Sequence, residues 1–152
     1  MKKIFTILVT IILLTSCQEE KTFDVKITDS LNGFLKDKSA GDKFLEIESF
    51  EILKEYTVKE RKEKVNENTL NAVRTMNETF PSPDILAQFE KEFEFLNKQT
   101  DETAIALYEV KFIVKKETLI NEEIPADYKA LILNDKDLSV VFMSIFKEVS
   151  HH

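Results

Sequence analysis

The sequence has little of the residue types on which most catalytic and cofactor sites depend. Its 152 residues include one cysteine, two glycines, two histidines and no tryptophan. The histidines, His151 and His152, end the sequence, whether they are natural or remain from a tag, so a core histidine base is excluded. Two glycines cannot build a phosphate-cradling loop, and haem, iron–sulfur and thiolate zinc sites lack their ligands. We therefore expect no cofactor, no metal site and no enzymatic activity.

Long hydrophobic runs are also scarce, and the clearest one opens the chain. Met1 to Lys3 give a cationic start, and residues 4–14 form an apolar run. A transmembrane helix needs about 20 such residues, so this run is too short to span a bilayer. A cationic start, a short apolar run and small residues together are typical of a secretory signal peptide.

The run leads into Leu14-Thr15-Ser16-Cys17, which resembles the bacterial lipobox. The resemblance implies cleavage after residue 16, which removes the signal peptide 1–16, and lipidation of the Cys17 thiol, whose acyl chains hold the protein to a membrane. An ordinary signal peptide, with a cysteine near its cleavage site by chance, is the alternative. It would leave a soluble periplasmic protein.

The residues after Cys17 bear on the destination. Gln18 differs from the aspartate that resembles an inner-membrane retention signal in enteric lipoproteins, so the outer membrane is implied. Glu19 and Glu20 resemble acidic export tethers of surface-exposed lipoproteins in Gram-negative bacteria. Because any solvated tether is polar, a periplasmic and a surface-facing position both stay open.

The charge balance is acidic. Removing residues 1–16 takes away two lysines and no acid, which changes the formal net charge from −7 to −9. Such a domain is repelled by nucleic acid, so we expect no nucleic-acid partner. The acidity suits a basic protein partner in the envelope, and it equally serves solubility.

The mature chain has room for one domain with one core. We expect a lipidated tether over residues 17–24 and a single globular domain over residues 25–150. No cysteine remains for a disulfide, so the fold must depend on burial, with phenylalanine as its main bulky residue.

Periodicity predicts the elements of this domain. Ile27, Leu31, Phe34 and Leu35 predict a helix over 25–38, with Asp29 or Ser30 as its cap. Residues 45–58 alternate as a strand, but the apolar parity changes between Ile47 and Phe50, which requires a bulge or two shorter strands. A helical stripe follows over 59–80: Val65, Thr69, Ala72, Val73, Met76 and Phe80.

Pro81-Ser82-Pro83-Asp84 ends that helix and starts another, with Ser82 as a hydrogen-bonding cap, Pro83 at the first helical position and Asp84 in the first turn. Its apolar face carries Ile85, Phe89, Phe93 and Leu96, and Phe95 falls off this stripe, so it either joins the core or meets a partner. The two helices predict a helical hairpin.

The last third predicts three strands. Residues 104–114 alternate strictly, and 128–133 and 138–146 form a hairpin. The last strand is apolar on both faces, so we expect a central, covered position in a monomer. The order predicts an α+β fold: an antiparallel sheet of about four strands with helices packed on one face. It is loosely similar to cystatin-like or NTF2-like domains.

Candidate binding positions are aromatic. Tyr56, Tyr108, Tyr128, Phe112 and Phe142 can line a ligand cleft or a binding surface, and they can equally belong to the core. A cavity lined by Phe112, Val114, Phe142 and Met143 would mark a ligand-binding module.

Acidic pairs give no specific catalytic signal. Glu122 with Glu123 and Asp135 with Asp137 are neighbours of the kind that arise by chance among 28 acids. Residues 134–137 offer oxygen ligands for calcium but lack the glycine and the terminal glutamate of a calcium loop, so a hairpin turn is favoured.

Three functions fit these residues. The first is a non-enzymatic envelope lipoprotein that binds a protein partner, as an accessory subunit or an immunity protein. The second is a small-molecule or lipid-binding module with an apolar cavity. The third is a carboxylate-dependent hydrolase, which would need two converging acids, at least one with a raised pKa.

Overall fold

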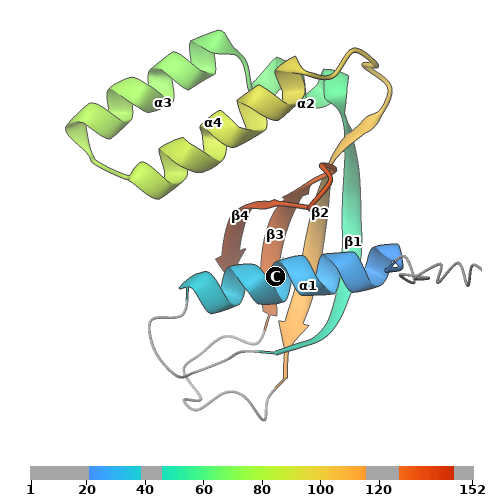
Figure 1. Ribbon diagram of the computed structural model, residues 1–152. Helices are drawn as coiled ribbons and strands as arrows, with labels where there is room; N and C mark the ends of the chain where they lie inside the picture. Colours follow the sequence, from blue (N-terminus) through green and yellow to red (C-terminus); the bar gives the residue numbers. More distant parts are fainter. Residues whose placement is uncertain (1–20, 39–45, 116–126, 146–152) are drawn as a thin grey trace, which may run out of the picture.

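The computed structural model describes residues 21–38, 46–115 and 127–145. The signal peptide, Cys17, the acidic pair at residues 122 and 123 and the terminal histidines lie outside these ranges. Within them, no helix is both long and apolar enough to cross a membrane. The elements run as follows (Figure 1): α1 (Phe23–Lys38), β1 (Ile47–Thr57), α2 (Val58–Lys64), α3 (Glu67–Thr79), α4 (Pro83–Asn97), β2 (Ile105–Val114), β3 (Asp127–Leu133) and β4 (Val140–Ile145).

The four strands form one antiparallel sheet in the order β1-β2-β3-β4. Together with the helices, this confirms the α+β class and the four-stranded antiparallel sheet. β1 keeps its pairing with β2 by shifting register at three points, one of them between Ile47 and Ser49. The bulge predicted from the parity change before Phe50 is therefore confirmed.

Helix α1 covers one face of the sheet and forms the main core. Its Ile27, Leu31 and Leu35, four residues apart, are buried on one side of the helix. They pack against alternate residues of β2, which share one face because side chains alternate along a strand. These β2 residues are Tyr108, Val110, Phe112 and Val114.

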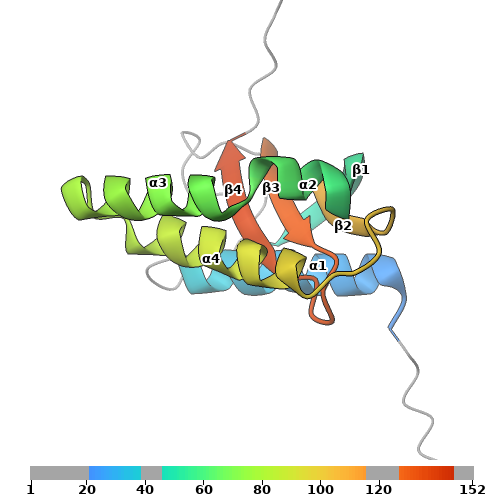
Figure 2. The same cartoon turned by 90° about the horizontal axis from the view of Figure 1, so that it is seen from above.

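Helices α2 and α4 contact the strands, and the hairpin of α3 and α4 lies across one end of the sheet (Figures 1 and 2). Phe95 of α4 packs with Leu107 and Val141. Leu107 and its neighbour Tyr108 point to opposite faces of the sheet. Helix α1 therefore packs on one face and Phe95 of α4 on the other, which corrects the expected packing of all helices on one face. A small separate core joins the helical unit to the strand ends: Val58, Val65, Leu96 and Ala106.

The single helix predicted over 59–80 is wrong, because the chain breaks into α2 and α3 at Asn66. The Asn66 side chain accepts hydrogen bonds from the backbone amides of Asn68 and Thr69, and the Thr69 hydroxyl accepts one from the Asn66 amide. This reciprocal capping satisfies the first amides of α3 and starts a new helix. Met76 and Phe80, expected on a buried stripe, are instead 65% and 73% exposed.

Helix α4 starts as predicted at Pro83, with Asp84 in its first turn, which confirms the helical hairpin. The Ser82 side chain makes no capping hydrogen bond, so that detail is wrong. Its carbonyl accepts from the amides of Ile85 and Leu86 instead, and its amide donates to the Asn77 side chain at 2.6 Å.

The other helix cap is also corrected. Helix α1 begins at Phe23, so Asp29 and Ser30 lie inside it. The Ser30 hydroxyl instead donates to the carbonyl of Leu138. Leu138 has a φ of 49°, a left-handed conformation that leucine rarely adopts, while its side chain is buried. β4 begins at Val140, two residues after Leu138.

The predicted central position of the last strand is wrong. Among the described strands, β4 pairs with β3 alone and forms one edge of the sheet, and β1 forms the other. Phe142 and Ile145 keep about half of their surface exposed, at 46% and 48%. A strand that is apolar on both faces thus lies at an edge, where its backbone is open to pairing.

Candidate functional site

An apolar hollow of about 440 Å³ lies where the end of α1, the start of α4 and β4 meet. We call it the β4 groove. Its apolar lining comes from Phe34, Ile85, Tyr128, Phe142, Met143 and Ile145, and its polar groups are Asp84, Gln88 and Ser144.

The β4 groove wraps around the outer edge of β4. Met143 lies opposite Ala130 and faces α1, whereas Phe142 lies opposite Leu131 and faces the helical hairpin. Because consecutive side chains of β4 point to opposite faces of the sheet and still line the same hollow, the edge of β4 lies between its two walls. The β4 groove therefore exposes both the edge backbone of β4 and an apolar lining.

The exposed apolar surface continues onto the helical hairpin. Met76, Phe80 and Ile85, which we call the hairpin patch, are 65%, 73% and 60% exposed. They line a second hollow of about 150 Å³ between α3 and α4. Ile85 also lines the β4 groove, so the two apolar surfaces are continuous.

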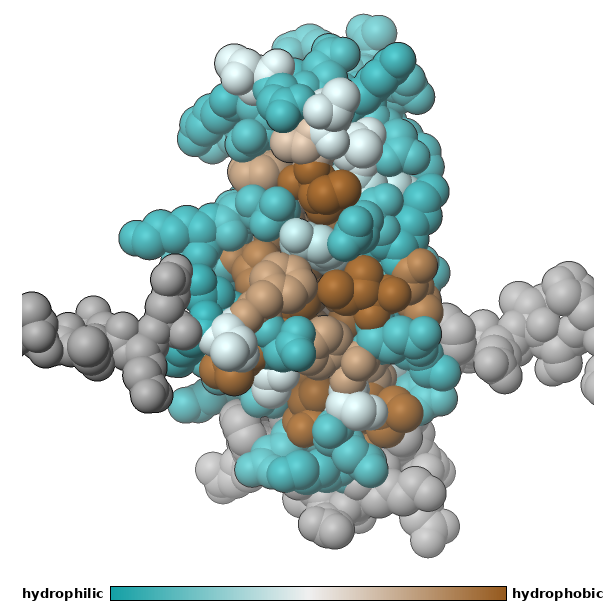
Figure 3. All heavy atoms as spheres, turned by 90° about the vertical axis from the view of Figure 1, so that its right-hand side faces the viewer, coloured by the Kyte–Doolittle hydropathy of each residue, from teal (hydrophilic) through white to brown (hydrophobic). Residues whose placement is uncertain are grey.

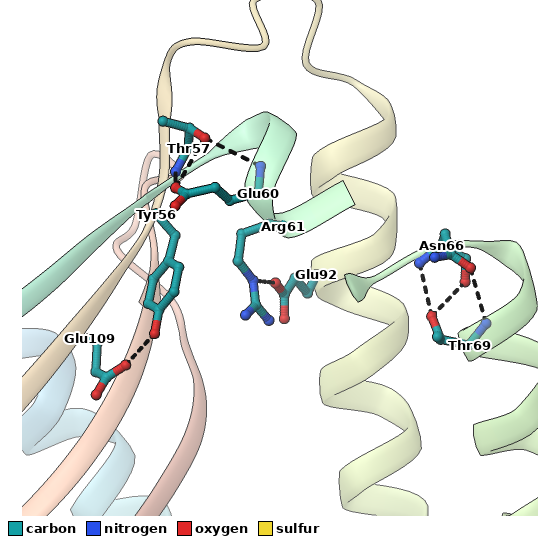
Figure 4. A network of polar contacts seen from close by, with 8 residues as sticks. All are labelled: Tyr56, Thr57, Glu60, Arg61, Asn66, Thr69, Glu92 and Glu109. Atoms are coloured by element: carbon teal, nitrogen blue, oxygen red, sulfur yellow. Dashed lines mark hydrogen bonds and ion pairs between the residues drawn. The ribbon is translucent and has the colours of Figure 1, made fainter. Parts of the chain in front are cut away.

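A buried ion pair joins the helical unit above the opposite face of the sheet. Arg61 Nε of α2 donates to Glu92 Oε1 of α4 at 2.7 Å, and their side chains are 11% and 6% exposed. Figure 4 shows the end of the Arg61 guanidinium between the Tyr56 ring and Glu92. Such a pair satisfies both charges and fixes α2 against α4.

A second polar cluster lies on the same face of the sheet. The Tyr56 hydroxyl donates to Glu109 Oε2 at 2.5 Å, and Lys129 Nζ lies 2.5 Å from Glu109 Oε1 (Figure 4 shows the first of these contacts). Lys54 and Arg61 lie over the Tyr56 ring at 4.3 and 5.5 Å from its centroid. Cations over an aromatic face are attracted by its quadrupole, so the cluster holds β1, β2, β3 and α2 together.

These contacts set the pKa values of the cluster. Burial acts to raise the pKa of Glu109, but hydrogen bonds from Lys129 and Tyr56 outweigh it, and the net pKa is lowered. The same hydrogen bond, first, and then burial raise the pKa of Tyr56. Glu109 is thus ionised and Tyr56 neutral at pH 7, which is opposite to the protonated carboxyl that a general acid requires.

Only two of the five predicted aromatic residues meet at one site. Tyr128 and Phe142 line the β4 groove. Phe112 is fully buried and stacks on Tyr128 with ring centroids 5.3 Å apart, so its predicted place in a cleft is corrected to the core. Tyr108 is also buried and meets Phe23 edge to face, and Tyr56 lies on the opposite face of the sheet.

The acidic loop is a turn. Asp135 Oδ1 accepts hydrogen bonds from the amides of Asp137 and Ser139, which confirms the predicted hairpin turn. Across residues 21–38, 46–115 and 127–145, no three acidic, histidine or cysteine side chains come together to hold a metal ion.

Neither the hairpin patch nor the ion pair between Arg61 and Glu92 was predicted from the sequence. Met76, Phe80 and Ile85 follow helical spacing, so they were predicted as buried; only their position at the tip of the hairpin, beside Pro81 and Pro83, distinguishes them. Arg61 and Glu92 are 31 residues apart, and no local pattern connects them.

Comparisons of the chain with protein-family models, with curated proteins and with solved structures give no match. The loose similarity to cystatin-like and NTF2-like domains therefore stays a prediction. The geometry of the chain itself carries the functional argument.

Proposed function

We propose that this chain is an envelope lipoprotein, anchored at Cys17 to the outer membrane, that binds a protein partner without catalysis. The partner binds the β4 groove and the hairpin patch. The mature acidity favours a basic partner, which the chain would bind as an accessory subunit of an envelope complex or as an immunity protein.

One observation carries the proposal: an uncharged edge strand lies inside an exposed apolar surface that continues onto two helices. Large exposed apolar patches mark interaction sites. An extended segment of a partner can add to β4 as a further strand, with backbone hydrogen bonds for affinity and side chains in the groove for specificity.

The polar clusters support a non-enzymatic role. Arg61 is paired with Glu92, and Glu109 is bound by both Tyr56 and Lys129. The carboxylates of Glu92 and Glu109 thus hold neighbouring helices and strands together. A carboxylate-dependent hydrolase is the least supported of the three functions for this reason.

A small apolar ligand is the second candidate, and the size of the β4 groove favours it. Its volume of about 440 Å³ lies within the range of about 300–1,000 Å³ typical of ligand sites. Asp84, Gln88 and Ser144 would supply the few polar contacts that orient such a ligand.

Photo-crosslinking in intact cells tests the partner proposal. A photoreactive amino acid replaces Phe142 or Ile85, and Leu53 on β1 serves as the matched position because it is 40% exposed against 46% for Phe142. We expect one protein adduct of defined mass from positions 142 and 85 and no protein adduct from position 53. Equal labelling at all three positions, or none at 142 and 85, contradicts the proposal.

A substitution that fills the groove separates the two candidates. Met143→Trp occupies the hollow with a larger side chain and leaves Ile85 and the hairpin patch unchanged. Loss of a co-purified small molecule, measured by native mass spectrometry, with the crosslink at position 85 retained would show that a ligand occupies the groove and a partner the patch. Loss of the crosslink without any bound small molecule favours a partner in the groove.

A further inference from the structure

The β1 side of the molecule carries a second exposed apolar surface, at the opposite edge of the sheet from the β4 groove. Phe23 and Val25 at the start of α1 and Leu53 of β1 are 38%, 44% and 40% exposed. Figure 3 looks at this side and shows apolar side chains gathered across its middle, with polar side chains above and below. We call these three residues the β1 patch.

The position of the β1 patch along the chain limits what can cover it. Phe23 lies six positions after Cys17 in the chain. A chain extends by at most about 3.5 Å per residue, so a lipid on Cys17 holds the start of α1 within roughly 20 Å of the membrane. Phe23 and Val25 therefore stay close to the bilayer in any conformation of the tether.

Helix α1 sets the orientation of the rest of the domain. Its first residues line a hollow with β1, and Phe34 near its end lines the β4 groove. At about 1.5 Å per residue the helix spans roughly 24 Å. If the β1 patch meets the membrane, the β4 groove faces away from it.

The chemistry around the patch selects the kind of lipid. Phe23, Val25 and Leu53 are apolar, whereas the exposed charged residues of β1 are Glu48, Glu51, Lys54 and Glu55, three of which are acidic. Apolar side chains enter the boundary between headgroups and acyl chains, but carboxylates are repelled by anionic lipids. A leaflet of zwitterionic headgroups fits both properties.

We propose that Phe23, Val25 and Leu53 dock into the zwitterionic leaflet that holds the lipid anchor, with β1 toward the membrane and β4 directed away. This inference rests on the lipid anchor of the proposed function. It assigns the two edges of the sheet to two different contacts, the bilayer and the partner.

Depth-dependent fluorescence quenching tests the orientation on the full lipidated protein. The thiol of Cys17 is consumed by lipid, so a cysteine introduced as Val25→Cys, Leu53→Cys or Ile85→Cys is the only free thiol for an environment-sensitive dye. Each labelled protein is reconstituted into phosphatidylcholine vesicles that contain a spin-labelled lipid. We expect at least about threefold more quenching at positions 25 and 53 than at position 85, since only the first two enter the interface.

Position 53 is the decisive one, because it lies far from the tether in sequence and approaches the bilayer only if the whole face docks. Quenching at 25 with none at 53 overturns the proposal, and so does equal quenching at 53 and 85. Replacing part of the phosphatidylcholine with phosphatidylserine is expected to reduce quenching at 53.

Flotation of the same samples distinguishes a failure of the docked orientation from a failure of the lipid anchor in the proposed function. A protein that does not float with the vesicles lacks the anchor, and both proposals fail. A protein that floats but shows no preference for positions 25 and 53 keeps its anchor and loses only the docked orientation. Circular dichroism of each variant verifies that the fold is intact.

Discussion

The two edges of the sheet differ in charge and in regularity. β1 carries Glu48, Glu51, Lys54 and Glu55 along its length and shifts register at three points. β4, over Val140–Ile145, carries no charged residue and shifts register once. Charges and bulges are the usual means by which an edge strand resists pairing with another chain.

The contrast shows that one edge is protected and the other is open. Charges at both edges would protect the sheet fully from pairing with other chains. The apolar side chains of β4 are instead joined by the hairpin patch and the groove. We infer that the open edge is kept for binding, and the following changes test that difference.

Loss of the ion pair that fixes α4 against α2 should have the largest effect. Arg61→Ala leaves Glu92 buried without its counter-charge, which we expect to destabilise the fold by about 3–5 kcal/mol. Urea unfolding followed by circular dichroism measures the change. The double variant Arg61→Met with Glu92→Leu removes both charges and should recover most of the loss; a double variant as unstable as the single one would contradict this role.

A charge in the groove should weaken partner binding at the open edge. Phe142→Lys places an ammonium in an apolar site, and we expect partner affinity to fall at least about tenfold, as for loss of an interface hot spot. Asn97→Lys adds the same charge at the far end of α4 and should leave affinity within about twofold. The affinity of each variant is measured by titration with the partner that crosslinking identifies. Equal losses of affinity in both variants would refute a site at β4.

Self-association should respond to the same edge more weakly. Ser144→Lys gives β4 a charged side chain, which β1 already has and β4 lacks, and we expect slower aggregation of the concentrated domain by several-fold. Glu51→Val removes a charge from β1 and should make aggregation faster. Light scattering at matched concentration compares the two, and faster aggregation of the Ser144→Lys variant would count against the comparison.

The cluster between the edges should contribute least. Tyr56→Phe removes the hydrogen bond to Glu109, at a cost of about 1 kcal/mol at pH 7. Because the pKa of Glu109 is lowered on folding, its contribution is present above its unfolded pKa and is lost as the pH falls through the folded value. The acid slope of stability should therefore be shallower in Tyr56→Phe; an unchanged slope would exclude this hydrogen bond as its source.

The same hydrogen bond acts in the opposite direction at high pH. The pKa of Tyr56 is raised, so its contribution is complete below the unfolded pKa and is lost as the pH rises through the folded value. Burial also raises the pKa of Tyr108 and Tyr128. With no tryptophan in the chain, phenolate absorbance should appear at a higher pH in the folded protein than in urea.

Elements with a strong period were predictable from the sequence. Ile27, Leu31 and Leu35 recur every four residues, and β2 alternates, so both were found with nearly correct bounds. The break at Asn66 was missed because the apolar stripe continues through it, whereas the local capping interaction ends the helix. The edge position of β4 was missed because an apolar strand reads the same whether a sheet or a partner covers it.

The candidate site was predicted in part. Tyr128 and Phe142 were identified from their side-chain chemistry and do line the groove. The hairpin patch was not, because a helical stripe indicates which residues share a face and not what that face meets. Arg61 and Glu92 meet only through the packing of α2 on α4, which no periodicity specifies.

The helical unit joins the sheet at one place, between β1 and β2. The amide of Val58 donates to the carbonyl of Ala104 at 2.9 Å, and that of Lys59 donates to Glu102 at 3.1 Å, so the entry and exit of the unit lie side by side. Residues 58–104 thus behave as an insertion in the hairpin of β1 and β2. Its helices can lengthen, shorten or be exchanged while both strands keep their pairing, so one wall of the groove can change without disturbing the packing of α1 on the sheet.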